Sequence, residues 1–110
     1  MVIRLWRGRA SPDRAGLYRT HFTTEVVPKL RRVAGFLSAH LLERRLADRV
    51  EFLVMTEWAS WEAIRQFAGD DPGRAVVEPE ARQVLLEYDA TVEHFERGPS
   101  SLPPAGRAQG

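Results

Sequence analysis

The spacing of apolar residues changes several times along the chain and predicts alternating strands and helices. Residues 50–58 form the clearest strand, a run rich in branched and aromatic side chains. Residues 2–7 form a shorter run of the same kind, which Gly8 is expected to break. A further strand is expected over residues 36–46, leading into a turn at 47–49. The pattern thus supplies three strands for a sheet.

A first helix is expected after residues 11–13. Ser11 can cap a helix start, Pro12 suits the first helical position and Asp13 suits the first turn. Pro28 has no backbone N–H and is expected to kink or end this helix locally. The apolar residues of the stretch recur every three or four positions and so fall on one stripe: Ala15, Tyr18, Phe22, Val26, Leu30 and Val33.

The second half of the chain predicts another helix, capped by Ser60, with Ile64 and Phe67 on one side and Gly69 at its end. Three further elements complete the prediction: a turn at 70–73, a short helix from Pro79 to about Leu86, and a final strand over 88–95. The predicted order is therefore β-α-β-β-α-α-β.

This order predicts an α+β protein of the ferredoxin-like class, a split βαβ arrangement with a four-stranded antiparallel sheet and both main helices on one face. The strand over 50–58 nevertheless has apolar residues on both faces, Phe52 and Val54 on one and Leu53 and Met55 on the other. A solvated sheet face normally carries polar residues. We therefore expect a second copy of the chain to cover the other face, giving a homodimer.

Charge and composition narrow the classes of function. The chain of 110 residues has 16 Lys plus Arg and 15 Asp plus Glu, so it lacks the basic excess of a dedicated nucleic-acid-binding protein. Its 44% hydrophobic and 28% charged residues are ordinary for a globular protein. Residues 98–110 are rich in Pro, Gly and Ser and predict a disordered tail. One folded domain is expected over residues 1–97.

Metal and membrane functions have little support in the sequence. There is no cysteine, and the three histidines, His21, His40 and His94, lack the close spacing of metal ligands. The longest apolar runs are far shorter than the ~20 residues that cross a bilayer, and the start of the chain lacks the core of a signal peptide. We expect a cytoplasmic protein without a metal site.

Three segments together resemble the antibiotic biosynthesis monooxygenase (ABM) family. They are the run Gly-Phe-Leu-Ser-Ala at 35–39, the run Thr-Glu-Trp-Ala-Ser-Trp-Glu-Ala-Ile-Arg-Gln-Phe at 56–67, and His94-Phe95 near the end. The resemblance extends over about residues 2–97 and implies a dimeric α+β barrel. It also implies a substrate cavity in each subunit, between the helices and the sheet, with Trp58 in its wall.

The sequence departs from the patterns of both oxygenase branches of this family. The resemblance to the quinone-forming branch, which uses no cofactor, places that branch's asparagine at Val54 and its tyrosine at Ile64. The resemblance to the haem-degrading branch places the axial histidine near Val77 and an asparagine near Trp6 or Arg7. This chain has no asparagine at all. Haem degradation is therefore disfavoured, no cofactor is expected, and a polar group that could hold an oxyanion is missing from the wall.

Four residues are the catalytic candidates, Trp58, Arg82, His40 and His94. Trp58 can stack on an aromatic substrate and donate its N–H, and Arg82 aligns with an arginine that holds anionic substrate in the quinone-forming branch. His40 or His94 can accept a proton near neutral pH.

Each candidate also has a purely structural interpretation. Trp58 can be a core residue, and Arg82 can be a surface arginine paired with Glu78 or Glu87. His40, which is expected to share a face of its strand with Phe36 and Ser38, and His94 can both be hydrogen-bonded structural residues. His21, beside Phe22 on the first helix, is expected to face solvent.

The expected substrate-binding residues are Trp6, Arg4, Phe52, Val54, Ile64, Phe67 and Tyr88. Arg4 lies on the same side of the strand as Trp6. If Trp6 faces the cavity, Arg4 is therefore expected to face it too, and the charge of Arg4 then needs a ligand or an acidic partner. The resemblance implies a cofactor-independent monooxygenase acting on a phenolic or polycyclic aromatic small molecule. The alternative is a non-redox, ligand-binding or cyclase-like dimeric barrel without oxygenase activity.

Overall fold

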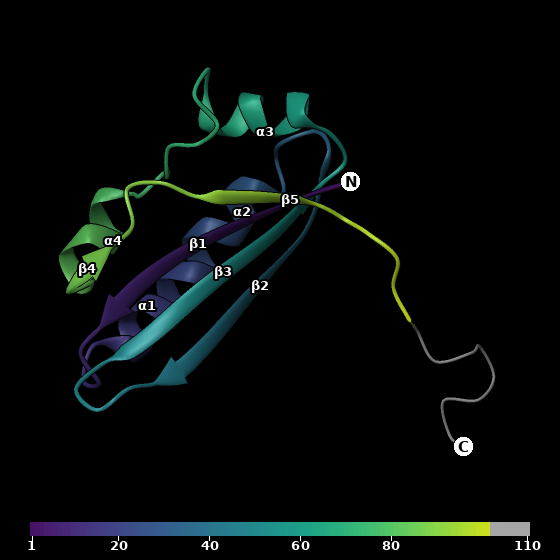
Figure 1. Cartoon of the computed structure of the whole chain (residues 1–110). Coiled ribbons are helices and arrows are strands. Elements are labelled where there is room, and N and C mark those ends of the chain that lie inside the picture. The colour runs from purple at the N-terminus through teal and green to yellow at the C-terminus, as the bar shows by residue number, and fades with distance from the viewer. Residues whose placement is uncertain (102–110) are drawn as a thin grey trace.

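Five strands form one antiparallel sheet in the computed structural model, which describes residues 1–101 (Figure 1). The central strand β1 (Val2–Ala10) lies between β3 (Val50–Trp58) and the two last strands, β4 (Glu87–Tyr88) and β5 (Glu93–Glu96). The strand β2 (Phe36–Arg45) pairs with the far side of β3. This is the strand order of the ferredoxin-like fold, so the predicted α+β class is confirmed.

The strand β1 does not break at Gly8 but runs to Ala10. Gly8 pairs with Phe52 on one side and Tyr88 on the other. A Cβ atom built on Gly8 would lie 2.8 Å from Cη2 of Trp6, so the absent side chain makes room for the indole ring. The glycine here marks a close packing contact rather than the end of the strand.

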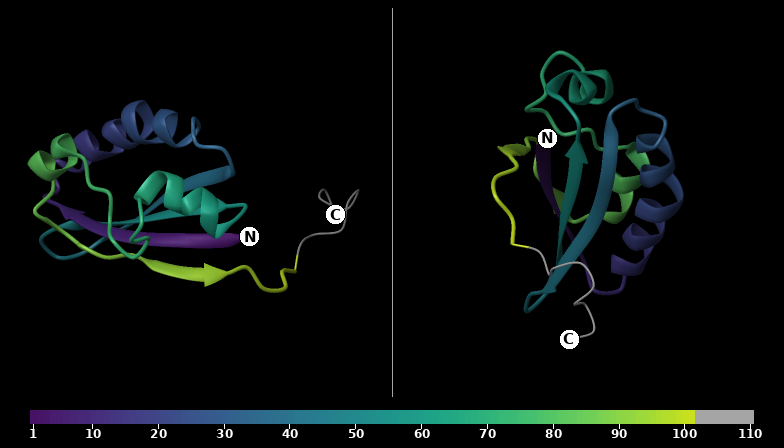
Figure 2. Two further views of the ribbon diagram at one scale, coloured as in Figure 1. Left: turned by 90° about the horizontal axis from the view of Figure 1, so that it is seen from above. Right: turned by 90° about the vertical axis from the view of Figure 1, so that its right-hand side faces the viewer.

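The helical layer follows β1 and covers one face of the sheet (Figures 1 and 2). It consists of α1 (Ala15–His21), the π-helical segment η1 (Phe22–Val26) and α2 (Val27–Leu30). The predicted cap is wrong: the helix begins at Ala15 after Arg14, and Ser11 contributes its backbone carbonyl, which accepts from the N–H groups of Arg14 and Ala15. A turn at residues 12–14 therefore precedes the helix.

Pro28 accounts for the π-helical segment in this layer. Pro28 stands in the first turn of α2 and has no N–H for the carbonyl four residues before it. The chain widens just before it, with the Val27 N–H donating to the Phe22 carbonyl. Thr24 Oγ1 donates to the Thr20 carbonyl at 2.7 Å, and Thr23 also bonds back to this turn. The expected local irregularity thus lies on the N-terminal side of the proline.

The next elements match the prediction closely. The strand β3 has the predicted bounds, and α3 (Trp61–Ala68) begins after Ser60, whose Oγ accepts from the Ala63 N–H at 3.2 Å. Gly69 ends the helix with a φ of +86°. In β2, a bulge after Phe36 inserts one residue, so that Phe36 and Ser38 face opposite sides of the sheet. The expectation that His40 shares a face with Phe36 is therefore wrong; it shares one with Ser38.

The C-terminal segment contains the predicted short helix, followed by two short strands instead of the single strand predicted over 88–95. After α4 (Pro79–Val84), β4 and β5 flank residues 89–92, which leave the sheet to contact the loop at 73–75. The Ala75 N–H donates to the Ala90 carbonyl and the Val92 N–H donates to the Gly73 carbonyl. This long-range pairing has no signal in the local sequence.

The two faces of the sheet differ in what covers them. The helices lie on one side, the inner face, and none lies on the other in the described chain (Figure 2). Along β3, inward residues are buried and outward residues are only half-buried. The cross-strand register gathers apolar side chains on the uncovered side, here called the outer face: Ile3, Leu5, Leu42, Leu53, Met55 and Phe95. Leu42 and Phe95 are about half exposed, at 47% and 52%.

Part of the predicted tail, residues 102–110 of 98–110, lies outside the described residues. In residues 1–101, no helix has the length and apolar character needed to cross a membrane.

Candidate functional site

A cavity of about 150 Å³ lies between the helical layer and the inner face of the sheet. Its floor consists of Arg4 and Trp6 from β1 and of Val54 and Thr56 from β3. Four groups of residues form its walls: Tyr18 and His21 from α1, Val26, Lys29 and Leu30 from η1 and α2, residues 76–78 with Ala81, and Phe67 with Val92. Most of these side chains are apolar, and the polar ones stand at separate places on the wall.

Trp6 provides the largest flat surface of the floor. Its Nε1 donates to the Asp89 carbonyl at 2.8 Å, which fixes the plane of the indole. The ring centroid lies 6.2 Å from that of Tyr18, and the two planes are tilted by 41°. An aromatic ligand would therefore meet an indole face with its N–H already used by the protein.

Arg4 occupies the floor beside Trp6 with only 5% of its surface exposed. Its guanidinium donates to the carbonyls of Pro72 at 2.5 Å and Arg74 at 2.8 Å, and Nη1 lies 3.1 Å from His94 Nε2. The expected acidic partner is thus replaced by backbone carbonyls. Burial lowers the pKa of Arg4 to about 10, which leaves the group charged at neutral pH. The cavity therefore has a fixed positive charge in its floor.

A second polar group stands on the helical wall. Glu78 Oε1 lies 3.4 Å from His21 Nε2, and its other oxygen is paired with Lys29 Nζ. His21 is only 9% exposed, and its Nε2 is enclosed without a well-formed hydrogen bond. Burial and the nearby Glu78 carboxylate raise the pKa of Tyr18 above its usual range, so this phenol stays neutral.

The expectation that His21 faces solvent is wrong. Position 21 lies three residues after Tyr18, so it falls on the same apolar stripe at helical spacing. That periodicity was the signal that could have placed it inward. The partner Glu78 is 57 residues further along the chain, and nothing in the local pattern links the two.

Trp58 lies next to the cavity but not in its wall. The side chain is completely buried in a cluster with Leu30 and Ile64. Its ring stacks on Phe67 at 5.5 Å between centroids, and its Nε1 donates to Thr56 Oγ1 at 2.8 Å. Thr56 and Phe67 are cavity residues, so Trp58 supports the wall from behind.

The other expected substrate-binding residues divide into two groups. Val54 and Phe67 line the cavity, as do Trp6 and Arg4. Phe52 and Ile64 are fully buried in the two core clusters and do not line it. Tyr88 is 36% exposed on the edge strand β4, away from the wall.

The remaining catalytic candidates also lie outside the cavity wall. Arg82 is exposed on α4, where its Nε donates to the Val77 carbonyl. His40 is exposed on β2, on the side of the outer face. His94 on β5 packs on Trp61 with 4.7 Å between ring centroids, and burial together with the Arg4 charge lowers its pKa. The two histidines stand at opposite edges of the sheet.

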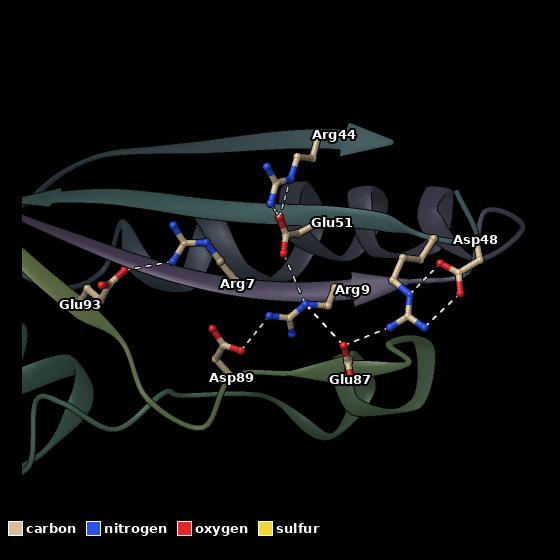
Figure 3. A network of polar contacts seen from close by, with 9 residues as sticks. Arg7, Arg9, Arg44, Asp48, Glu51, Glu87, Asp89 and Glu93 are labelled. Atoms are coloured by element: carbon tan, nitrogen blue, oxygen red, sulfur yellow. Dashed lines mark hydrogen bonds and ion pairs between the residues drawn. The ribbon is translucent and has the colours of Figure 1, made fainter. Parts of the chain in front are cut away.

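Charged residues at one end of the outer face form a paired network (Figure 3). Arg9 contacts Asp89 at 2.9 Å, Glu51 at 3.4 Å and Glu87 at 3.5 Å. The hydrogen bond to Asp89 raises the pKa of Arg9 above its usual value. Arg44 adds a 2.7 Å contact to Glu51. Each of these arginines is paired with at least one carboxylate, so the network is explained by contacts within the protein.

The sequence profile described as antibiotic biosynthesis monooxygenase matches residues 1–79. The chain belongs to the ABM family. No curated protein matches it significantly. Among solved structures, a Deinococcus radiodurans protein assigned to the same monooxygenases is 18% identical, with a TM-score of 0.63, and the match covers 96% of this chain and 100% of that one.

Two further structures of this fold contain ligands. A monooxygenase from the gene ActVA-Orf6 of Streptomyces coelicolor, in complex with nanaomycin D, is 19% identical with a TM-score of 0.63, covering 94% of this chain and 92% of its own. A mutant of MhuD with two manganese protoporphyrin IX molecules bound per active site is 21% identical with a TM-score of 0.59, covering 94% of this chain and 100% of its own. At these identities the likeness establishes the shared ABM fold.

Proposed function

We propose that this ABM protein is a cofactor-independent monooxygenase that oxidises a small phenolic compound in the cavity. The observation that carries the proposal is an apolar cavity with an indole floor, a buried cation at Arg4 and a carboxylate–imidazole pair at Glu78 and His21. An electron-rich ring fits the apolar walls, and the charge of Arg4 stabilises an anion formed on it. Structures of the same fold that hold nanaomycin D or a porphyrin support ligand binding in this family.

The cavity volume refines the substrate class. Small-molecule sites usually span ~300–1,000 Å³, whereas this cavity has about 150 Å³. A single-ring hydroquinone suits this space better than a polycyclic aromatic. Its oxidation balances without a cofactor: a hydroquinone and O₂ give a hydroxyquinone and water. One ring C–H bond, both phenolic O–H bonds and the O–O bond break. One C–O bond and three O–H bonds form, one in the new hydroxyl group and two in water, and the substrate supplies all four electrons.

We propose in addition that the protein acts as a homodimer in which a second copy covers the outer face. The half-exposed Leu42 and Phe95 and their apolar neighbours form a surface of the kind that isologous pairs bury. Replacing Met55 by Lys should convert the dimer to monomer in light scattering on size-exclusion chromatography. Leu17→Lys, at an apolar and more exposed position on α1, is the control and should leave the mass unchanged. A monomeric wild type contradicts this proposal.

The oxygenase proposal is tested by O₂ uptake and quinone absorbance with single-ring hydroquinones and with larger anthrones, without added cofactor. Val54→Phe fills the cavity floor and should abolish uptake, while Leu17→Phe places the same aromatic side chain on the exposed side of α1 and should not. Equal rates for Val54→Phe and the wild type would place the chemistry outside this cavity.

A non-redox, ligand-binding or cyclase-like role is the second candidate. This role is supported by Val54 and Ile64, which are apolar where the quinone-forming branch has polar residues. The chain also contains no asparagine. Quenching of tryptophan fluorescence by hydroquinones without any O₂ consumption would favour this role over oxidation.

A further inference from the structure

We propose that His21 is the base of the cavity: Glu78 holds its imidazole through Nε2, and Nδ1 takes the proton from the hydroxyl group of a bound phenol. The proposal rests on the proposed function for the class of ligand, and it assigns the proton acceptor that the sequence had placed at His40 or His94.

The burial of His21 is the first argument. Its Nε2 is enclosed and lacks a well-formed hydrogen bond, and the side chain lines the cavity. Buried polar atoms are nearly always satisfied, so this nitrogen is expected to have a partner. The Glu78 carboxylate lies 3.4 Å from Nε2, within ion-pair range but outside the geometry of a formed hydrogen bond. A carboxylate at that nitrogen favours the tautomer with its proton on Nε2 and leaves the Nδ1 lone pair for a ligand.

The surrounding groups agree with this role. Glu78 faces His21 from the segment before α4, Lys29 faces Glu78 from α2, Tyr18 stands one turn before His21 on α1, and Arg4 lies in the cavity floor. Lys29 and Glu78 form an ion pair, so a proton gained by His21 creates an imidazolium beside a carboxylate that is already held in place. Tyr18 stays neutral and does not compete for the proton.

The position of His21 in its helix agrees with this role, and Pro28 accounts for the irregular turn itself. His21 is the last residue of α1, and the π-helical segment η1 starts at the next residue. Single π-helical turns inside α-helices are rare and occur frequently at functional sites. Here the irregular turn directly adjoins the residue with the unsatisfied nitrogen.

The other two histidines lack this arrangement. His40 is exposed on the opposite side of the sheet. The Nε2 atom of His94 faces the Arg4 guanidinium, and burial together with this charge lowers the pKa of His94. Among the three, only His21 combines a place in the cavity wall with an acidic partner.

The step is a simple proton transfer. The phenol O–H bond breaks, its electron pair stays on the oxygen, and the proton forms a bond with Nδ1. No oxidant or reductant takes part. The resulting phenolate lies in the same cavity as Arg4, whose positive charge stabilises it.

The probe for this step is 4-nitrophenol, whose phenolate form has its own visible absorbance band. It is added to the full-length protein at a pH below the ionisation midpoint of the free probe. The wild type should generate the phenolate band as the probe binds. His21→Gln should still bind the probe, as followed by tryptophan fluorescence, but should give at most about one tenth of the wild-type phenolate per bound molecule.

Glu78→Gln provides a second variant at a partly exposed position, and it should lose part of the band because the imidazole is no longer held in one tautomer. Glu25→Gln is the matched control, an exposed carboxylate one turn before Lys29 that does not line the cavity, and its band should equal that of the wild type. Circular dichroism verifies that each variant is folded.

Three outcomes would overturn the proposal: a wild-type band in His21→Gln, equal losses in Glu78→Gln and Glu25→Gln, or no binding of the probe by the wild type. A phenolate band that depends on His21 without O₂ uptake on hydroquinones would support the proposal and reject the oxygenase function, so the two failures are distinct.

Discussion

Two tryptophans on the same face of the same sheet have different environments. Trp58 at the end of β3 is fully buried, whereas Trp6 on β1 lies in the floor of the cavity. They are separated by two rows of the sheet, since Trp58 pairs with Val2 and Trp6 pairs with Val54. Residue type and strand position therefore do not decide which one can meet a ligand. The elements packed above each ring decide it.

Close packing explains the closed end of the sheet. A Cβ atom on Gly35 would lie 2.6 Å from the Cβ of Ala63, so two small residues let the start of α3 approach the chain leading into β2. Ile64 and Leu30 then fill the space around Trp58. Above Trp6, by contrast, the tilted ring of Tyr18 and the segment around Glu78 do not fill the space, and the cavity remains between them.

The largest expected effect is on stability at the closed end. Trp58→Ala should lower the free energy of unfolding by about 3–5 kcal/mol, because it opens a void in a filled core. Trp6→Ala should cost clearly less, since this ring already borders open space, and should instead weaken ligand binding. Urea denaturation of both variants measures the difference. Equal losses would mean that the two rings are equivalent core residues.

An intermediate effect is expected at Thr56, which connects the two ends. Thr56→Val removes the acceptor of the buried Trp58 Nε1 and should cost about 1–3 kcal/mol at nearly constant volume. Thr56→Ser keeps the hydroxyl and is the control for that hydrogen bond. Thermal unfolding followed by near-ultraviolet circular dichroism reports both the stability of the variant and the environment of the indole ring. A Thr56→Val variant as stable as the wild type would show that this bond does not secure Trp58.

The smallest effect is expected at Arg82. Its side chain is exposed and donates to one backbone carbonyl, so Arg82→Ala should change stability by no more than about 0.5 kcal/mol. Phenol affinity by fluorescence titration should match that of Arg65→Ala, an exposed arginine on α3. A large, selective loss of affinity in Arg82→Ala would extend the functional region from the cavity to α4.

The sequence predicted best where the signals were local. The bounds of β3 followed from its continuous apolar run, and those of α3 from Ser60 and Gly69, whose capping depends only on neighbouring backbone groups. Errors arose where distant segments intervene. Gly8 was interpreted as a break because its role depends on the Trp6 ring, and the final strand is divided because residues 89–92 pair with the loop at 73–75.

The sequence by itself thus determined the order of the strands and helices, the ferredoxin-like class and the apolar character of both sheet faces, because periodicity and capping act over a few residues. Only the tertiary structure decided which side chains enclose the cavity. It buried Trp58 behind Thr56, left Trp6 in the floor, and brought Glu78 to His21 across 57 positions of sequence. Such meetings depend on how whole elements pack, and side-chain spacing within one element carries no record of them.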